Sequence, residues 1–147
     1  MDYDLLCEEL AALTEGVSFA LSNLSNASAL LYDRLPRLNW AGVYLFADGK
    51  LRLGPFQGKP ACVEIAPGRG VCGTAFAEDR TVRVEDVHAF PGHIACDAAS
   101  RSEIVIPLRK AGVPMGVLDL DSPDLARFTE QDRVGLEAFA ALLEQWI

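Results

Sequence analysis

Three cysteines in the middle of the chain could carry out thiol redox chemistry. Cys62, Cys72 and Cys96 fall in a region rich in glycine, proline and other residues typical of loops. Thiols that meet at one cavity can form a relay, in which one attacks and becomes a sulfenic acid and another condenses with it to a disulfide. Cys96 is the best candidate for the attacking thiol, because it is loop-borne, has small neighbours and follows His93 by three residues.

The sequence leaves the charge state of Cys96 open. An imidazolium at His93 would favour the thiolate, whereas the carboxylates of Asp97 and Glu103 would oppose it. A partly buried cysteine in an ordinary connection is the simplest alternative for this residue. Cys7, near the start of the chain, is assigned no role.

Three acidic residues interrupt two otherwise apolar segments. Glu103 precedes Ile-Val-Ile, and Asp119 and Asp121 alternate with leucine, so the two aspartates share one face of a predicted strand. Crowded carboxylates raise one another's pKa, so a protonated one can donate to a substrate oxygen while an ionised one binds an ammonium group. The aromatic residues Trp40 and Tyr44 could receive an apolar or sulfur-bearing group, although packing in the core would equally explain Trp40.

A structural zinc site is not expected from the spacing of the metal-binding residue types. The chain has four cysteines and two histidines, and its sequence contains no Cys-x-x-Cys pair. The three central cysteines and His93 could in principle converge on an ion. Without closely spaced ligand pairs a zinc site is not expected, and the proposed thiol chemistry needs neither a metal nor an organic cofactor.

The elements predicted to position these residues form an α+β domain with a largely antiparallel sheet. A long helix is expected over 3–34, with a break near Gly16 or in the Ser-Asn-rich stretch 22–28, and a final helix begins after its N-cap, Thr129. Between them we expect strands over 39–47, 51–56, 61–66, 80–84, 103–109 and 113–121, a short helix over 71–78 and a long loop over 85–99. The terminal helices should pack on one face of the sheet and the loops on the other, in a single domain spanning 1–147.

Charge and composition argue against several classes of partner. With 21 acidic and 13 basic residues, the net charge of −8 disfavours binding to nucleic acid or to an anionic membrane. No apolar run approaches the ~20 residues that span a bilayer, and the chain starts with Met-Asp-Tyr-Asp rather than with the basic start of a secretory signal. We therefore expect a soluble, cytoplasmic protein.

The motifs described above resemble those of the free methionine-(R)-sulfoxide reductases, enzymes built on a GAF-type domain. The most specific part of the resemblance is the spaced cysteine triplet, which a GAF-type sensor does not need. The similar stretches are 39–44, 54–62, 68–73, 84–87, 90–97, 102–104 and 116–122. The resemblance implies a GAF-like fold and the thiol-dependent reduction of free L-methionine-(R)-S-oxide to L-methionine.

The same resemblance implies separate roles for the three thiols. Cys96 would be the nucleophile that becomes a sulfenic acid, Cys62 the main resolving thiol, and Cys72 a secondary partner. A thioredoxin-type dithiol would then restore the thiols, and a homodimer is among the assemblies that we consider.

For the remaining site residues, the resemblance implies binding roles. Glu103, Asp119 and Asp121 would bind the amino acid and the sulfoxide oxygen. Trp40 and Tyr44 would form the wall around the S-methyl group. These positions agree with those reached from residue chemistry, but the roles come from the family.

Two functions from other classes are weighed against the enzyme. A non-catalytic GAF-type sensor would bind a small ligand equally well without the Cys96 thiol, and would show no turnover. A thiol redox switch would form a disulfide with peroxide and act on a partner protein without any small substrate. The sequence shows no output domain for a sensor, and a switch would leave the acidic cluster without a purpose.

Overall fold

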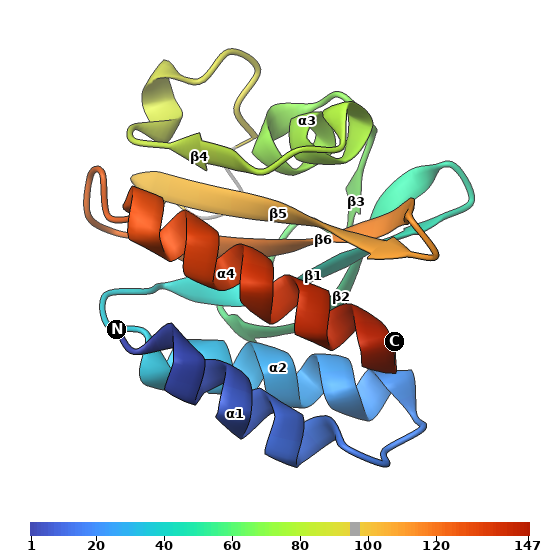
Figure 1. Ribbon diagram of the computed structural model, residues 1–147. Helices are drawn as coiled ribbons and strands as arrows, with labels where there is room; N and C mark the ends of the chain where they lie inside the picture. Colours follow the sequence, from blue (N-terminus) through green and yellow to red (C-terminus); the bar gives the residue numbers. More distant parts are fainter. Residues whose placement is uncertain (95–97) are drawn as a thin grey trace.

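The chain folds around a six-stranded antiparallel sheet in a computed structural model that describes residues 1–94 and 98–147 (Figure 1). The strands lie side by side in the order β3–β2–β1–β6–β5–β4. Their bounds are Trp40–Ala47 (β1), Lys50–Gly58 (β2), Glu64–Ile65 (β3), Val82–Val84 (β4), Ser102–Lys110 (β5) and Val113–Ser122 (β6). The helices are Tyr3–Thr14 (α1), Ala20–Arg34 (α2), Gly70–Glu78 (α3) and Glu130–Leu143 (α4), with short 3-10 turns at Val87–Ala89 (η1) and Glu144–Trp146 (η2).

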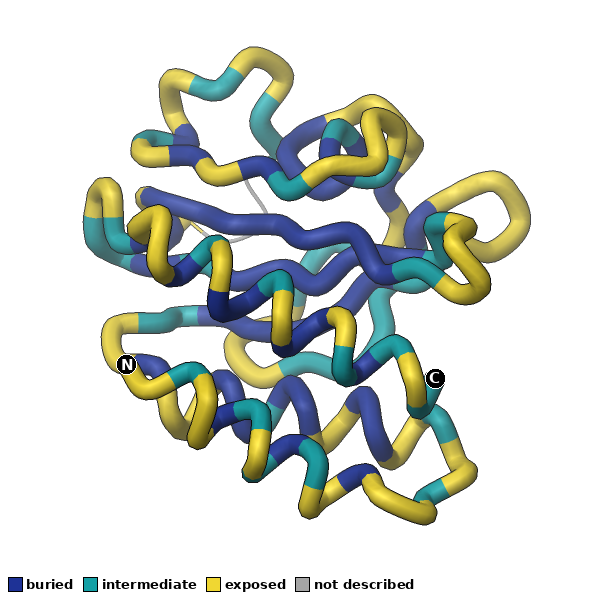
Figure 2. Tube along the Cα trace, viewed as in Figure 1, coloured by how far each residue is buried: buried dark blue, intermediate teal, exposed yellow. Residues whose placement is uncertain are grey.

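The two faces of the sheet contribute to two separate cores. Helices α1, α2 and α4 pack over one face, whereas α3 covers the other (Figure 1). In β1, Ala41 and Val43 are buried beneath the three helices, and Trp40 and Tyr44 are buried on the side of α3. Figure 2 shows the central strands as mostly buried, as coverage of both faces requires. The predicted α+β fold, with the terminal helices on one face, is confirmed.

The N-terminal helical region consists of two helices. Helix α1 ends at Thr14 and α2 begins at Ala20, and Gly16 between them has a φ of 75°, which favours glycine. The break predicted near Gly16 is confirmed. The Ser-Asn-rich stretch 22–28 instead lies inside α2, where the Ser28 hydroxyl donates to a backbone carbonyl one turn earlier.

Helix α4 begins where the sequence predicts, with Thr129 as its N-cap. The Thr129 hydroxyl accepts a hydrogen bond from the backbone N–H of Asp132, and the Asp132 carboxylate accepts one from the backbone N–H of Thr129. Asp132 also accepts a hydrogen bond of 2.6 Å from the Tyr3 hydroxyl. This contact ties the start of α1 to the start of α4.

The strand expected over 61–66 is wrong in extent. Strand β3 contains only Glu64–Ile65, so Cys62 precedes the strand. Continuing the antiparallel ladder with β2 would bring position 61 opposite Pro55, and a proline has no N–H to donate. Cys62 is therefore held by contacts other than the sheet ladder.

The loop expected over 85–99 contains a short helical turn, η1. The Asp86 carboxylate accepts a hydrogen bond of 3.0 Å from the backbone N–H of His88, which caps this turn. A single acidic side chain therefore orders the start of a segment that the sequence predicted to be irregular.

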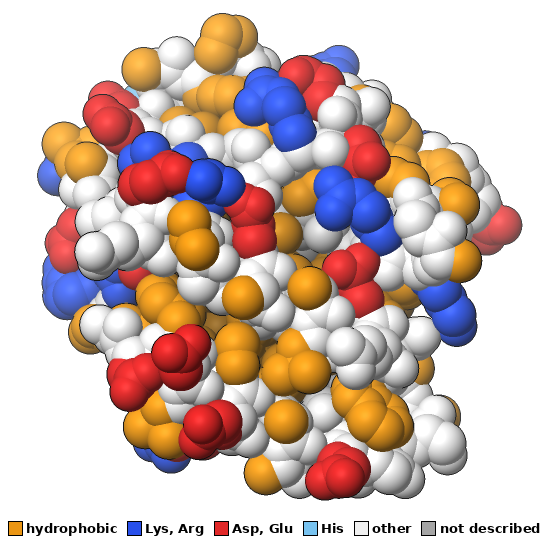
Figure 3. All heavy atoms as spheres, in the orientation of Figure 1, with side chains coloured by type: hydrophobic (Ala, Val, Ile, Leu, Met, Phe, Trp, Pro, Cys, Tyr) orange, Lys and Arg blue, Asp and Glu red, His pale blue; other side chains and the backbone are white. Residues whose placement is uncertain are grey.

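The molecular surface around α4 mixes acidic and basic side chains (Figure 3). On this helix, Arg133 forms ion pairs with Glu130 and Glu137 on the neighbouring turns. Within the described part of the chain, no helix has the length and apolar composition needed to cross a bilayer.

Candidate active site

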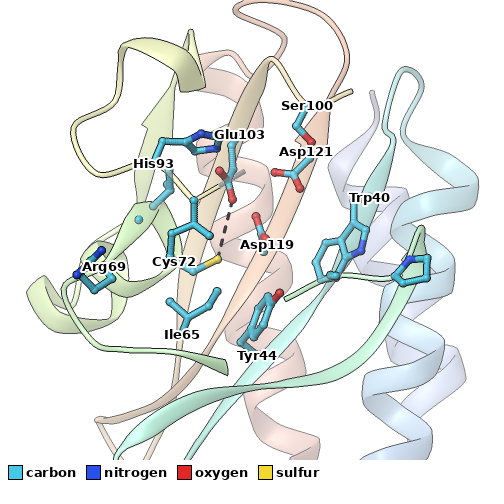
Figure 4. Close-up of a pocket in the computed structure, with 15 residues that line it drawn as sticks. Trp40, Tyr44, Ile65, Arg69, Cys72, His93, Ser100, Glu103, Asp119 and Asp121 are labelled. Carbon is cyan, nitrogen blue, oxygen red and sulfur yellow. Dashed lines mark hydrogen bonds between the residues drawn. The ribbon is translucent and has the colours of Figure 1, made fainter. Parts of the chain in front are cut away.

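A cavity opens on the α3 side of the sheet, away from the three packed helices (Figure 4). Of the eight predicted catalytic and substrate-binding residues, six line it together: Trp40, Tyr44, Cys72, Glu103, Asp119 and Asp121. The other lining residues are Pro60, Ala61, Ile65, Arg69, Gly70, Val71, His93, Ile94 and Ser100. The cavity therefore brings predicted aromatic, thiol and acidic groups from four different elements to one place.

The register of the sheet positions the acidic side chains. Glu103 on β5 is paired with Asp121 on β6, and Asp119 lies two residues before Asp121, so both aspartates point to the cavity side. On the other side of β6, Gly42 of β1 is paired with Asp119. A Cβ at Gly42 would lie only 2.8 Å from the Trp40 ring, so glycine leaves the space that the indole fills.

Glu103 and Asp119 form a buried, hydrogen-bonded pair of carboxyl groups. Their exposed fractions are only 7% and 5%. Burial raises the pKa of Glu103 well above its usual value, and the charges of Asp119 and Asp121 raise it further. Burial also raises the pKa of Asp119, while hydrogen bonds from Glu103 and Cys72 oppose that rise. Glu103 is thus the carboxyl group that holds the proton, and Asp119 accepts from it.

Cys72 lies against this pair from the first turn of α3. Its Sγ is 3.9 Å from Oε2 of Glu103, and its side chain also donates to Asp119. Burial, followed by the charges of Asp119 and Glu103, raises the pKa of Cys72 well above that of an ordinary thiol. Cys72 is therefore a neutral S–H group that donates to the acids.

One oxygen of this cluster has no partner. Oδ1 of Asp119 is buried and accepts no hydrogen bond from any residue in 1–94 or 98–147. Ligand atoms of Cys72, Glu103 and Asp119 all lie within 4.8 Å of one another, so these three side chains could hold a cation. The unpaired oxygen and the surrounding acids make the cavity a place for a positively charged group.

Aromatic rings form the wall next to the acids. The Trp40 ring stacks on Phe56, with centroids 5.2 Å apart, and on Tyr44, with centroids 5.9 Å apart. The Trp40 indole N–H donates to the carbonyl of Lys59, and the Tyr44 hydroxyl donates to the carbonyl of Cys62 at 2.8 Å. Burial raises the pKa of Tyr44, so its hydroxyl stays a donor and holds the segment that carries Cys62.

The described cysteines differ in oxidation state. Cys7 and Cys72 are free thiols, and Cys62 takes part in a disulfide. Cys96, the predicted nucleophile, lies outside the described residues. The described residues on either side of it, Ile94 and Ser100, line the cavity.

Sequence reasoning missed two polar residues at the cavity, Arg69 and Ser100. Arg69 is the residue before α3, within a glycine-rich turn, and its place at a helix N-terminus was the signal that could have found it. Ser100 accepts a hydrogen bond of 3.0 Å from the Asn39 side chain, a contact that no local pattern predicts. His93 also lines the cavity, where burial and the nearby His88 lower its pKa and favour the neutral imidazole over the imidazolium considered above.

Comparison with known proteins identifies the family. The GAF domain family matches residues 5–147. The free methionine-R-sulfoxide reductase of Escherichia coli (strain K12) is 55% identical over 143 residues, which cover 97% of this chain and 87% of that protein. The chain belongs to the free methionine-R-sulfoxide reductases of the GAF family.

Solved structures of free methionine-R-sulfoxide reductases agree with this assignment. The reduced form of fRMsr from Staphylococcus aureus has 51% sequence identity and a TM-score of 0.96, and the match covers 99% of this chain and 94% of that one. The free methionine-R-sulfoxide reductase of Neisseria meningitidis in complex with its substrate has 43% identity and a TM-score of 0.94, with 97% and 86% covered. The predicted family, fold and enzyme class are confirmed, whereas the roles of individual residues stay predictions.

Proposed function

We propose that the protein reduces free L-methionine-(R)-S-oxide to L-methionine through a sulfenic acid at Cys96 and an intramolecular disulfide. The observation that carries this proposal is the buried Glu103–Asp119 pair beside an aromatic wall in one cavity. Such a cavity offers a proton donor, a partner for an ammonium group and an apolar surface. The named relatives supply the substrate class.

The cavity can bind each part of a free amino acid. The unpaired Oδ1 of Asp119 faces the cavity and can accept from the substrate ammonium, with Asp121 adjacent. The N-terminus of α3 has N–H groups without partners inside the helix, and with Arg69 beside it, it suits the substrate carboxylate. Trp40 can pack against the S-methyl group. A residue within a polypeptide has neither free group, which explains selectivity for the free amino acid.

In the chemical step, Cys96 attacks the sulfur of the sulfoxide while Glu103 donates its proton to the sulfoxide oxygen. The bond that Cys96 has formed to the substrate sulfur and the S–O bond then both break as the hydroxyl moves to the Cys96 sulfur. The substrate sulfur is thereby reduced to the thioether, and the thiol is oxidised to a sulfenic acid. The thiol proton of Cys96 returns to the carboxyl pair. At the end of the step the carboxyl pair is protonated again, and Cys96 is a sulfenic acid that a second thiol can attack.

Cys62 is the proposed resolving thiol. Its sulfur attacks the sulfenic acid of Cys96, a disulfide forms and one water molecule leaves. Two observations support Cys62 over Cys72: Cys62 takes part in a disulfide while Cys72 is a free thiol, and Cys72 has a raised pKa against the acids. A secondary role of Cys72 in resolution stays a prediction.

Further features of this proposal come from the sequence. A thioredoxin-type dithiol reduces the disulfide, and the scheme uses no metal and no organic cofactor. A single catalytic domain over 1–147, a cytoplasmic location and a homodimer also stay predictions.

A turnover assay tests the proposal. Purified protein is incubated with dithiothreitol and free L-methionine-(R)-S-oxide, and methionine is quantified by chromatography. We expect turnover of the (R) epimer, and no methionine from the (S) epimer or from a peptide that contains methionine sulfoxide. The matched control is Cys96→Ser. Equal methionine from that variant would remove Cys96 from the mechanism.

The same samples distinguish the other functions. Ligand binding without any turnover would favour a GAF-type sensor. Disulfide formation by peroxide, with no methionine produced from either epimer, would favour a redox switch.

A further inference from the structure

We propose that Cys72, Glu103 and Asp119 form a binding site for a thiophilic divalent cation of the zinc class, which competes with the ammonium group of the substrate. The binding itself can be tested alone, whereas the competition rests on the proposed function. The cation would act as an inhibitor of the thiol chemistry rather than as a resident cofactor.

The positions of the three ligand atoms suit one ion. A zinc ion lies about 2.3 Å from sulfur and about 2.0–2.2 Å from carboxylate oxygens, so in its tetrahedral geometry two ligand atoms are about 3.5 Å apart. The Sγ of Cys72 and one oxygen each from Glu103 and Asp119 lie within 4.8 Å of one another. Side-chain shifts of up to about 1 Å would close this set around a tetrahedral ion. The three ligands come from α3, β5 and β6, which explains why no closely spaced pair marks the site in the sequence.

The charge of the cluster favours a cation. All three side chains are at least nine-tenths buried, and Oδ1 of Asp119 has no hydrogen-bond partner within the described chain. The largest charge effects on Glu103 come from two other acids, Asp119 and Asp121. A buried carboxylate cluster without a counter-charge is costly, and a divalent ion supplies that counter-charge at one point.

The three protein ligands leave a fourth coordination position of the ion open to solvent or to another ligand. Three protein ligands with an open position are typical of zinc sites that exchange a ligand. The ion would occupy the Asp119 oxygen assigned to the substrate ammonium, and would take the carboxyl group assigned as the proton donor. Because thiol and carboxyl ligands bind a metal in their deprotonated forms, binding should release protons into the buffer.

Cadmium is the probe for the binding test, because its thiolate complexes absorb in the ultraviolet. The protein carries Cys7→Ser and is oxidised so that Cys62 and Cys96 form the proposed disulfide, which leaves Cys72 as the thiol that can bind. We expect one cadmium ion per chain, a thiolate absorption band and proton release. Cys72→Ser should abolish the band, and Asp119→Asn should weaken binding at least about tenfold, the lower end of what outer-shell changes alone cost.

Glu8→Gln, at an exposed position of α1, is the matched control and should leave cadmium binding unchanged. The absence of binding, or a band that persists in Cys72→Ser, would overturn the proposal.

A second variant tests the competition without turnover. In Cys7→Ser/Cys62→Ser/Cys96→Ser, Cys72 is the remaining cysteine, and no disulfide can form within the chain. Free L-methionine-(R)-S-oxide should raise the apparent dissociation constant of cadmium in proportion to its concentration, whereas the (S) epimer should do so less. Cadmium binding that the (R) epimer leaves unchanged would refute the shared site. Failure of the proposed function appears separately, as the lack of methionine formation by the reduced wild-type protein without added metal.

Discussion

Replacing Glu103 with glutamine should stabilise the protein at neutral and alkaline pH. The carboxyl group is buried, and burial with the charges of Asp119 and Asp121 raises its pKa in the folded state. Glutamine has a similar shape and can still donate to Asp119 through its amide N–H, but it does not titrate. The substitution therefore removes a pH-dependent loss of folding stability while leaving the packing of the site in place.

The sign and size of this effect follow from proton linkage. In the unfolded chain glutamate titrates near 4.5, below its pKa in the folded protein. Between these two values the folded state holds the proton and the unfolded state has lost it, so the free energy of unfolding decreases as pH rises. One proton gives a slope of at most about 1.4 kcal/mol per pH unit. Each pH unit within this window therefore removes a sizeable share of the total stability, which is about 5–15 kcal/mol for typical domains.

Urea unfolding at pH 5, 6, 7 and 8, followed by tryptophan fluorescence, measures this effect. The stability of Glu103→Gln relative to wild type should increase from pH 5 upward, and its turnover should fall because the proton donor is lost. Glu8→Gln, at an exposed position of α1, is the control and should show no such trend. A Glu103→Gln difference that is constant over this range, or that grows toward acid pH, would refute the assignment of the proton to Glu103.

Three further substitutions test the packing around the site. Thr129→Ala removes one half of the α4 capping box and should lower the free energy of unfolding by about 1 kcal/mol in urea titrations, with kcat unchanged. Tyr44→Phe removes the hydrogen bond of 2.8 Å to the Cys62 carbonyl, so it should lower the free energy of unfolding by about 1–2 kcal/mol. It should also slow the loss of thiols after one turnover, and an unchanged rate would show that this contact does not position Cys62. Gly42→Ala would place a Cβ 2.3 Å from Cβ of Phe56 and should cost about 2 kcal/mol or more, so an unaltered melting temperature would contradict the described packing.

Local patterns in the sequence were enough to predict most of the fold. Alternation along β1 separates Trp40 and Tyr44 from Ala41 and Val43, and the structure places these pairs in the two different cores. The same period of two predicts that Asp119 and Asp121 share a face. Such patterns succeed because burial on either side of a strand depends only on residue order.

Contacts between elements could not be predicted in this way. The approach of Cys72 to Glu103 depends on how α3 packs on β5, and the pairing of Glu103 with Asp121 depends on the register of a hairpin. Strand β3 contains only Glu64–Ile65, and the proline on its neighbour β2, which no pattern within 61–66 reveals, removes a donor further along the ladder. The roles of Cys62 and Cys96 came from family resemblance and await experiment.

A single-turnover experiment tests the central claim most directly. Fully reduced protein, freed of all added thiol, is mixed with one equivalent of free L-methionine-(R)-S-oxide, and methionine and remaining thiols are counted together. We predict close to one equivalent of methionine and the loss of two thiols, with the Cys62 and Cys96 peptides joined in the mass spectrum. Methionine formed without thiol loss, or a mixture in which both thiols and sulfoxide stay intact, would contradict the proposed chemistry.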